Sequence, residues 1–154
     1  LLKAPIQGEG IPSKGTPQGG ILSPLLSNIV LNEFDWWVSN QWETFPSRFP
    51  YRWDGDRCAA LKKTKLKEMY FVRYADDFKI FCRNKSDAKR VKIAVEEWLW
   101  ERLHLETSPE KSKITNLCRH YSEFLGFKLK LEERPKQNVI ISHMSDKAKK
   151  KVMN

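Results

Sequence analysis

The sequence has few cysteines and histidines, no long apolar run, and fewer acidic than basic residues. Its three cysteines, Cys58, Cys82 and Cys118, are odd in number, far apart and without a CxxC pair. The three histidines are equally isolated, so neither residue type has the spacing of a zinc site, and the pattern favours a reducing compartment. No stretch is long enough to span a membrane.

The first residues, LLKAPIQGEG, lack the charged and apolar regions of a secretion signal, and they lack an initiator methionine. We therefore expect the chain to begin within a longer protein. At 154 residues it has room for one domain, and 40% apolar with 31% charged residues is typical of a soluble globular chain. The net charge of +9 favours a polyanionic partner, most simply a nucleic acid, over a basic surface kept only for solubility.

The first third of the chain predicts a loop, a helix and a surface excursion. Residues 1–20 hold five of the seven glycines, which predicts a loop. Apolar residues then recur at helical spacing, and Ser23 and Pro24 suit an N-cap and first turn, so we predict a buried helix over about 24–40. Residues 41–68 interleave aromatic with basic side chains, which suits stacking on nucleic-acid bases and equally suits a loop that folds back on its own aromatics.

The middle of the chain predicts a hairpin followed by a helix. Two β-type runs, 69–74 and 77–82, are joined at Ala75-Asp76. SDAKRVKIAVEEWLWERL then predicts an amphipathic helix with Ser86 as its N-cap.

The last third predicts three strands and a basic helix. LETSPEKSKITNL suggests a turn and a short strand, SEFLGFKLKLEE a second strand bent at Gly126, and NVIISH a third. SDKAKKKVMN predicts the start of a basic helix. The predicted fold class is α+β, an antiparallel sheet with helices packed on one face and the other face open for a ligand.

Two adjacent carboxylates, Asp76 and Asp77, interrupt the apolar hairpin in FVRYADDFKIF. An Asp pair in a turn is ordinarily only a solvated turn. Here the apolar flanks must rest on a core, which would hold the carboxylates rigid at its rim, and carboxylates are preferred Mg²⁺ ligands. The glycine loop GTPQGG, residues 15–20, leads into a helix and could admit a phosphate, although it is equally a simple capping turn.

Four stretches, GTPQGGILSPLLSNIVL, YFVRYADDFKIF, LETSPEKSKI and EFLGFKL, resemble the palm motifs of reverse transcriptases in order and approximate spacing. The wording is most similar to the group II intron-encoded branch, whose members also act as splicing maturases. The resemblance covers nearly the whole of 15–129 and implies a polymerase palm that uses two Mg²⁺ ions, with Mn²⁺ as a substitute. It also implies an RNA template and intron RNA, a DNA primer and dNTP as partners, and a bacterial cytoplasmic protein; a homodimer stays open.

The resemblance also implies roles for individual residues. Asp76 would be the principal metal ligand and Asp77 its support. Lys111, with Lys113 as the alternative, would face the leaving pyrophosphate. The residues implied to bind the substrate are Pro17, Gln18, Gly19, Tyr74 and Ala75. The residues implied to position the primer strand are Phe124, Leu125, Gly126 and Phe127.

One departure from the family pattern bears on activity. The family's metal site needs a further Asp from upstream of the PQG loop, where the sequence offers only Glu9 in a loop, and Asp35 is better explained as a structural residue of its helix. We therefore expect a palm fragment that lacks most of the fingers and thumb and does not polymerise alone. The predicted division is a glycine- and proline-rich loop at 1–20, the palm at 21–135, and the palm end with the first thumb helix at 136–154.

The leading hypothesis is Mg²⁺-dependent transfer of a nucleotide from dNTP to a primer 3′-OH on an RNA template. The alternative is an RNA-binding splicing maturase without catalysis of its own. A third reading is a basic α+β domain whose Asp pair is only a turn.

Overall fold

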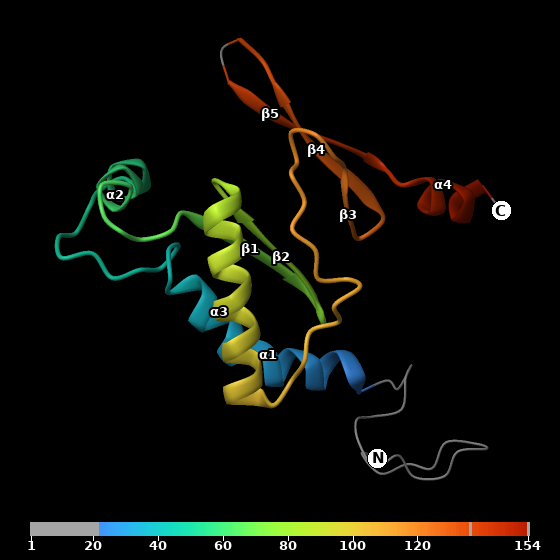
Figure 1. Cartoon of the computed structure of the whole chain (residues 1–154), viewed down its shortest axis with the longest axis horizontal. Coiled ribbons are helices and arrows are strands. Elements are labelled where there is room, and N and C mark those ends of the chain that lie inside the picture. Colours follow the sequence, from blue (N-terminus) through green and yellow to red (C-terminus); the bar gives the residue numbers. More distant parts are fainter. Residues whose placement is uncertain (1–21, 136, 154) are drawn as a thin grey trace. The chain divides into compact units, whose positions relative to one another are not determined.

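The computed structural model describes residues 22–135 and 137–153, and the chain divides into two compact units, one up to Glu106 and one from Thr107. Each unit is a separate assembly of helices and antiparallel strands (Figure 1). The first unit contains α1 Ser23–Ser39, α2 Asp54–Leu61, β1 Met69–Tyr74, β2 Asp77–Cys82 and α3 Lys85–Leu103. The second contains β3 Ser122–Phe124, β4 Phe127–Glu133, β5 Asn138–Met144 and α4 Asp146–Met153.

The β1–β2 hairpin has the register that the sequence predicts. Met69 pairs with Cys82 and Tyr74 with Asp77, which leaves Ala75 and Asp76 as a two-residue loop. Because side chains alternate across a strand, the hairpin has two different faces. The face toward the core carries Met69, Phe71, Phe78, Ile80 and Cys82, all packed in or against the buried cluster.

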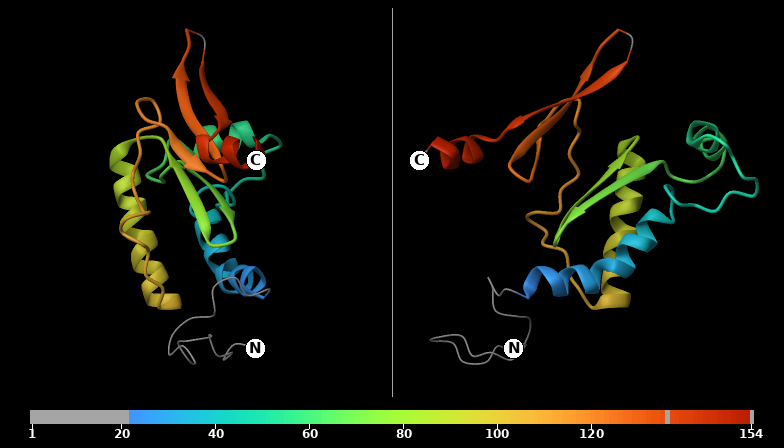
Figure 2. Two further views of the ribbon diagram at one scale, coloured as in Figure 1. Left: turned by 90° about the vertical axis from the view of Figure 1, so that its right-hand side faces the viewer. Right: turned by 180° about the vertical axis from the view of Figure 1, so that it is seen from behind.

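Helices α1 and α3 both pack on that one face of the hairpin (Figures 1 and 2). Phe34 of α1 is fully buried, and its ring lies 5.5 Å from that of Phe71, 5.1 Å from that of Phe78 and 5.5 Å from that of Trp98 in α3. The opposite face exposes Tyr70, Val72 and Tyr74. For this unit, the expected arrangement of helices on one face is confirmed.

The starts of the two long helices, α1 and α3, differ from the prediction. α3 is capped by Asn84, not Ser86: the extended Asn84 accepts a hydrogen bond on its side chain from the Asp87 N–H at 2.8 Å. α1 begins at Ser23 itself, behind Leu22, with no side-chain cap and with Pro24 in its first turn.

The excursion 41–68 contains a helix that the sequence did not predict. The DGD stretch starts α2, where the carboxylates of Asp54 and Asp56 lie in the first turn and interact favourably with the positive end of the helix dipole. Trp53 is extended and precedes the helix, and Leu61 at its end is buried in the core.

The second unit is a three-stranded antiparallel sheet in the order β3-β4-β5. The sequence predicted one bent strand over SEFLGFKLKLEE, and this was wrong. The chain reverses at Leu125 and Gly126 and forms two strands, β3 and β4. Both residues have left-handed φ, +50° and +79°, the signature of a tight turn that matches strand twist. The predicted strand NVIISH and the basic helix are confirmed as β5 and α4.

The strand expected within LETSPEKSKITNL is wrong. The Ser108 carbonyl accepts hydrogen bonds from the N–H groups of Lys111 and Ser112, and the Asn116 carbonyl accepts from those of Arg119 and His120. These local turns occupy backbone groups that a strand would use. The described strands form two sheets, of two and three strands, and not the single sheet expected. None of the described helices is long and apolar enough to cross a membrane.

Candidate functional site

The carboxylates of Asp76 and Asp77 lie exposed at the tip of the β1–β2 hairpin. Asp77 shares the outer face of the hairpin with Tyr74, its cross-strand partner, whose side chain is 66% exposed. Ala75 has a left-handed φ of +54°, a conformation that costs a non-glycine residue about 1–2 kcal/mol. The tip therefore combines accessible carboxylate oxygens with a strained turn, and other contacts must stabilise that turn.

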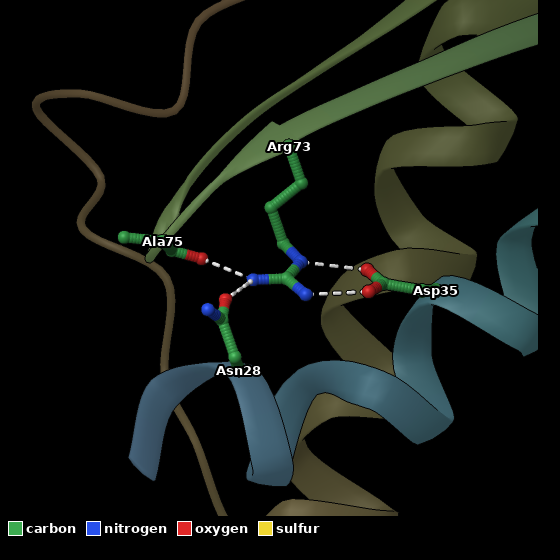
Figure 3. Close-up of polar contacts among 4 residues, drawn as sticks. All are labelled: Asn28, Asp35, Arg73 and Ala75. Atoms are coloured by element: carbon green, nitrogen blue, oxygen red, sulfur yellow. Dashed lines mark hydrogen bonds and ion pairs between the residues drawn. The ribbon is translucent and has the colours of Figure 1, made fainter. Parts of the chain in front are cut away.

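Arg73, two residues before Ala75, supplies those contacts (Figure 3). Its Nε donates to Asp35 Oδ1 at 2.6 Å and its Nη2 to Asp35 Oδ2 at 2.5 Å. Its Nη1 donates to Asn28 Oδ1 at 2.9 Å and to the Ala75 carbonyl at 2.5 Å. One guanidinium thus joins α1 to the carbonyl inside the acidic turn.

The Arg73–Asp35 pair is partly buried, because the Arg73 side chain is only 10% exposed. The hydrogen bonds that Arg73 donates to Asp35 raise the pKa of Arg73, against the opposing effect of burial. A two-point Arg–carboxylate contact is both stronger and more directional than a single-point one. The pair therefore fixes the position of the turn relative to α1.

The sequence interpretation named neither Arg73 nor its link to Asp35. A signal was present, because Arg73 follows Met69 and Phe71 at the two-residue spacing of the inward face. A cation on an inward face needs a carboxylate partner. Asp35 is the structural residue of its helix that the sequence indicated, and the structure adds its partner.

Lys79 lies on the outer face of the hairpin, two residues beyond Asp77. Partial burial lowers its pKa, and the nearby charge of Asp77 opposes that shift. The outer face near the tip therefore carries a cation as well as the acidic pair.

The donor set at the tip suits a hard divalent cation only in part. Asp76 and Asp77 offer carboxylate oxygens, and Mg²⁺ is usually bound by one or two carboxylates together with water and substrate phosphates. Across 22–135 and 137–153, no group of three Cys, His, Asp or Glu side chains could hold a metal ion. Asp35 is already engaged by Arg73. The tip thus fits Mg²⁺ when a phosphate completes the shell.

The remaining predicted residues fall elsewhere. Pro17, Gln18 and Gly19 lie outside the described residues. Lys111 and Lys113 are exposed in the turn-rich segment of the second unit, so their relation to Asp76 stays a prediction. The four residues expected at the primer strand, Phe124, Leu125, Gly126 and Phe127, form the β3–β4 turn. Within the first unit, the structure brings Tyr74, Ala75, Asp76 and Asp77 together at the tip of the hairpin.

A second group of accessible side chains lies before α2. The Arg48 guanidinium lies 5.9 Å from the centroid of Phe49, and that of Arg52 lies 5.7 Å from the centroid of Trp53. The two rings are 63% and 65% exposed. Phe49 and Trp53 are thus accessible for stacking, whereas Trp42 of the same segment is buried in the core, so both interpretations of 41–68 stay open.

Comparison with known proteins gives a consistent result. The model of the family described as "Reverse transcriptase (RNA-dependent DNA polymerase)" matches residues 6–129. The group II intron-encoded protein LtrA of Lactococcus lactis subsp. cremoris is 30% identical over 91% of this chain and 29% of its own length. Protein YkfC of Escherichia coli (strain K12) is 30% identical, over 76% of this chain and 32% of its own.

A putative COX1/OXI3 intron 2 protein of Saccharomyces cerevisiae is also 30% identical, over 79% of this chain and 18% of its own length. The chain therefore spans less than a third of the length of these relatives.

Proposed function

The chain belongs to the reverse transcriptase family, among the group II intron-encoded reverse transcriptases and maturases, and from that premise we propose that it forms the palm of an RNA-directed DNA polymerase. The reaction is transfer of a nucleotide from dNTP to a primer 3′-OH on an RNA template. The observation that carries the proposal is the exposed Asp76–Asp77 pair at a hairpin tip, on a strand that a buried aromatic core supports.

In this proposal each residue of the tip has a distinct task. Asp76 and Asp77 hold Mg²⁺, which when bound lowers the pKa of the primer hydroxyl and offsets charge on the leaving pyrophosphate. The exposed Tyr74 ring lies beside Asp77 on the outer face, where it can pack against the primer end or the incoming nucleotide. Lys111 is assigned to the pyrophosphate, and the net charge of +9 suits a nucleic-acid duplex.

The division of the chain remains part of the proposal. Residues 21–135 are assigned to the palm, 1–20 to the substrate loop that contains Pro17, Gln18 and Gly19, and 136–154 to the palm end and first thumb helix. A third carboxylate, supplied from outside this chain, would complete the metal shell. We therefore expect the 154-residue chain to bind Mg²⁺ weakly and not to polymerise by itself.

The test is Asp76→Ala in the complete polypeptide that carries this chain. Primer extension on an RNA template should fall by about 10²-fold or more, since the charge that develops during transfer loses its stabilising ion. Asp54→Ala is the matched control, because Asp54 is also an exposed acidic residue of the first unit but lies in α2. Normal extension by the Asp76→Ala protein would rule out the catalytic assignment.

The exposed Arg48–Phe49 and Arg52–Trp53 pairs favour a second function, binding of intron RNA as a splicing maturase without chemistry. Replacing Phe49 and Trp53 together by Ala should weaken intron binding, whereas Asp76→Ala should leave it intact. If Asp76→Ala abolishes extension but not splicing, one protein has both functions. If the double variant binds the intron as tightly as the parent, this segment is not the RNA site.

A further inference from the structure

We infer that Arg73, Asp35 and Asn28 form a charge-balanced clamp that positions the acidic turn for its metal. We call these three residues, together with their contact to the Ala75 carbonyl, the clamp. The inference rests on the proposed function, because it assigns positioning residues to the same site. The clamp acts through the backbone of the turn, at the Ala75 carbonyl.

The geometry of Arg73 fixes the orientation of the turn. A guanidinium has five N–H donors in a rigid plane, and four contacts from Arg73 are present, two to Asp35, one to Asn28 and one to the Ala75 carbonyl. Since Asn28 and Asp35 both belong to α1, the plane of the guanidinium is set by that helix. The Ala75 carbonyl is therefore held in one orientation, and Asp76 follows directly in the chain.

The backbone of the turn is strained at Ala75. Ala75 adopts φ +54° without being glycine, so the turn would relax if its carbonyl had no partner. Arg73 provides that partner from within the hairpin itself, at 2.5 Å. The residue that follows the strained position is the proposed principal ligand, Asp76, so loss of the contact should shift a carboxylate and not merely loosen a loop.

The clamp is also balanced in charge. An unpaired guanidinium that donates to the Ala75 carbonyl would add a net positive charge to the turn that carries Asp76, and that charge would oppose binding of a divalent cation there. Asp35 cancels that charge through its two-point contact with Arg73. The clamp can thus fix the turn without lowering the cation affinity of Asp76 and Asp77, which a lone arginine could not do.

Two conservative variants separate the effect of the clamp's shape from the effect of its charge. Arg73→Lys keeps the charge but loses the planar fork, so kcat should fall about 10- to 100-fold with little change in the Mg²⁺ concentration for half-maximal rate. Asp35→Asn keeps the shape but leaves Arg73 uncompensated, so the half-maximal Mg²⁺ concentration should rise roughly tenfold. A merely structural role would lower the unfolding temperature without this split.

The pair Arg102–Glu33 is the matched control. It also joins an arginine to a carboxylate of α1, with the arginine in α3, but both side chains are more than half exposed and neither contacts the turn. Arg102→Lys and Glu33→Gln should therefore leave both kcat and the Mg²⁺ dependence unchanged.

The experiment measures RNA-templated primer extension against Mg²⁺ concentration for the complete polypeptide and for these four variants. Amide hydrogen exchange of the 154-residue chain provides a readout apart from activity: Arg73→Lys and Asp35→Asn should speed exchange at Asp76 and Asp77 more than at Phe71 or Ile80. If a variant exchanges fast throughout the hairpin, it has lost its fold. The other variant and Asn28→Ala then test whether the clamp positions the turn.

Asp76→Ala, measured in parallel, separates two kinds of failure. If Asp76→Ala extends primers normally, the proposed function fails, and the clamp fails with it. If Asp76→Ala is inactive while Arg73→Lys and Asp35→Asn match the parent in kcat and Mg²⁺ dependence, the function stands and the clamp is wrong. The predicted split, together with local exchange at the turn, supports the clamp.

Discussion

The two units of the molecule differ in how much apolar surface they bury. Every buried apolar side chain among the described residues belongs to the first unit, where Phe34 and Trp42 are almost fully enclosed. In the second unit the one buried residue of the described range is Ser145, at the start of α4. Phe127 and Ile140, on the apolar face of its sheet, remain 48% and 58% exposed.

This difference shows where a precise site can be built. Burial of apolar surface stabilises the first unit, so its hairpin can hold carboxylates in a fixed place. The second sheet buries less apolar surface, so its stability depends more on backbone pairing between strands. The predictions below test that contrast, beginning with the largest expected effect.

Phe34→Ala should destabilise the first unit more than any other single truncation. The ring is fully buried among Phe71, Phe78 and Trp98, so its removal leaves a cavity that costs about 3–5 kcal/mol. Urea unfolding followed by tryptophan fluorescence measures the change. Ile140→Ala in the second unit is the comparison, and its cost should stay below about 1 kcal/mol because the side chain is already exposed. Equal costs would erase the contrast.

The two hairpin turns should respond oppositely to exchange of alanine and glycine. Gly126→Ala should cost about 1–2 kcal/mol, because Gly126 has φ +79° and a new Cβ would lie 3.3 Å from the Ala148 Cβ. Ala75→Gly should instead be neutral or stabilising by up to about 0.5 kcal/mol, because the strained φ of +54° suits glycine. Hydrogen exchange within each hairpin reports the two changes separately. A destabilised Ala75→Gly hairpin would show that its φ is not strained.

The cysteines should differ in reactivity, and we expect this difference to affect stability less than the substitutions above. Burial raises the pKa of Cys82 in β2, whereas Cys118 in the second unit is exposed. Iodoacetamide should therefore modify Cys118 first, and Cys82 only at higher pH or on unfolding. The pKa of Cys82 is higher in the folded than in the unfolded chain. The free energy of unfolding should therefore fall as pH rises from the pKa of the unfolded thiol through the raised pKa of the folded one. Mass spectrometry of timed samples measures the order.

The local pattern of the sequence predicted the elements whose signals are short-range. The α1 helix, the β1–β2 register and β5 follow from periodicity and from the two-residue gap at Ala75-Asp76. The β3–β4 reversal was missed because Leu125 is not a residue expected at positive φ. The α2 helix was missed because Asp and Gly signal a turn as readily as a helix start.

The site was predictable only in part. The acidic pair stands out in the sequence because it interrupts two apolar runs. The contact between Arg73 and Asp35 joins residues 38 positions apart, and local patterns do not specify pairing over such a separation. The division of the described strands into two sheets likewise depends on which strands pair, and the periodicity of each strand does not specify its partner.

The most direct test of the account is titration of the 154-residue chain with Mn²⁺, observed as paramagnetic broadening of its backbone amide NMR signals. Mn²⁺ prefers the same oxygen ligands as Mg²⁺, and weak binding is enough to broaden nearby signals. The account predicts that Asp76 and Asp77 broaden first, that Asp76→Ala removes the effect, and that the acidic pair Asp54 and Asp56 in α2 broadens only at higher concentration. Equal broadening at both pairs, or broadening at the hairpin that survives Asp76→Ala, would contradict it.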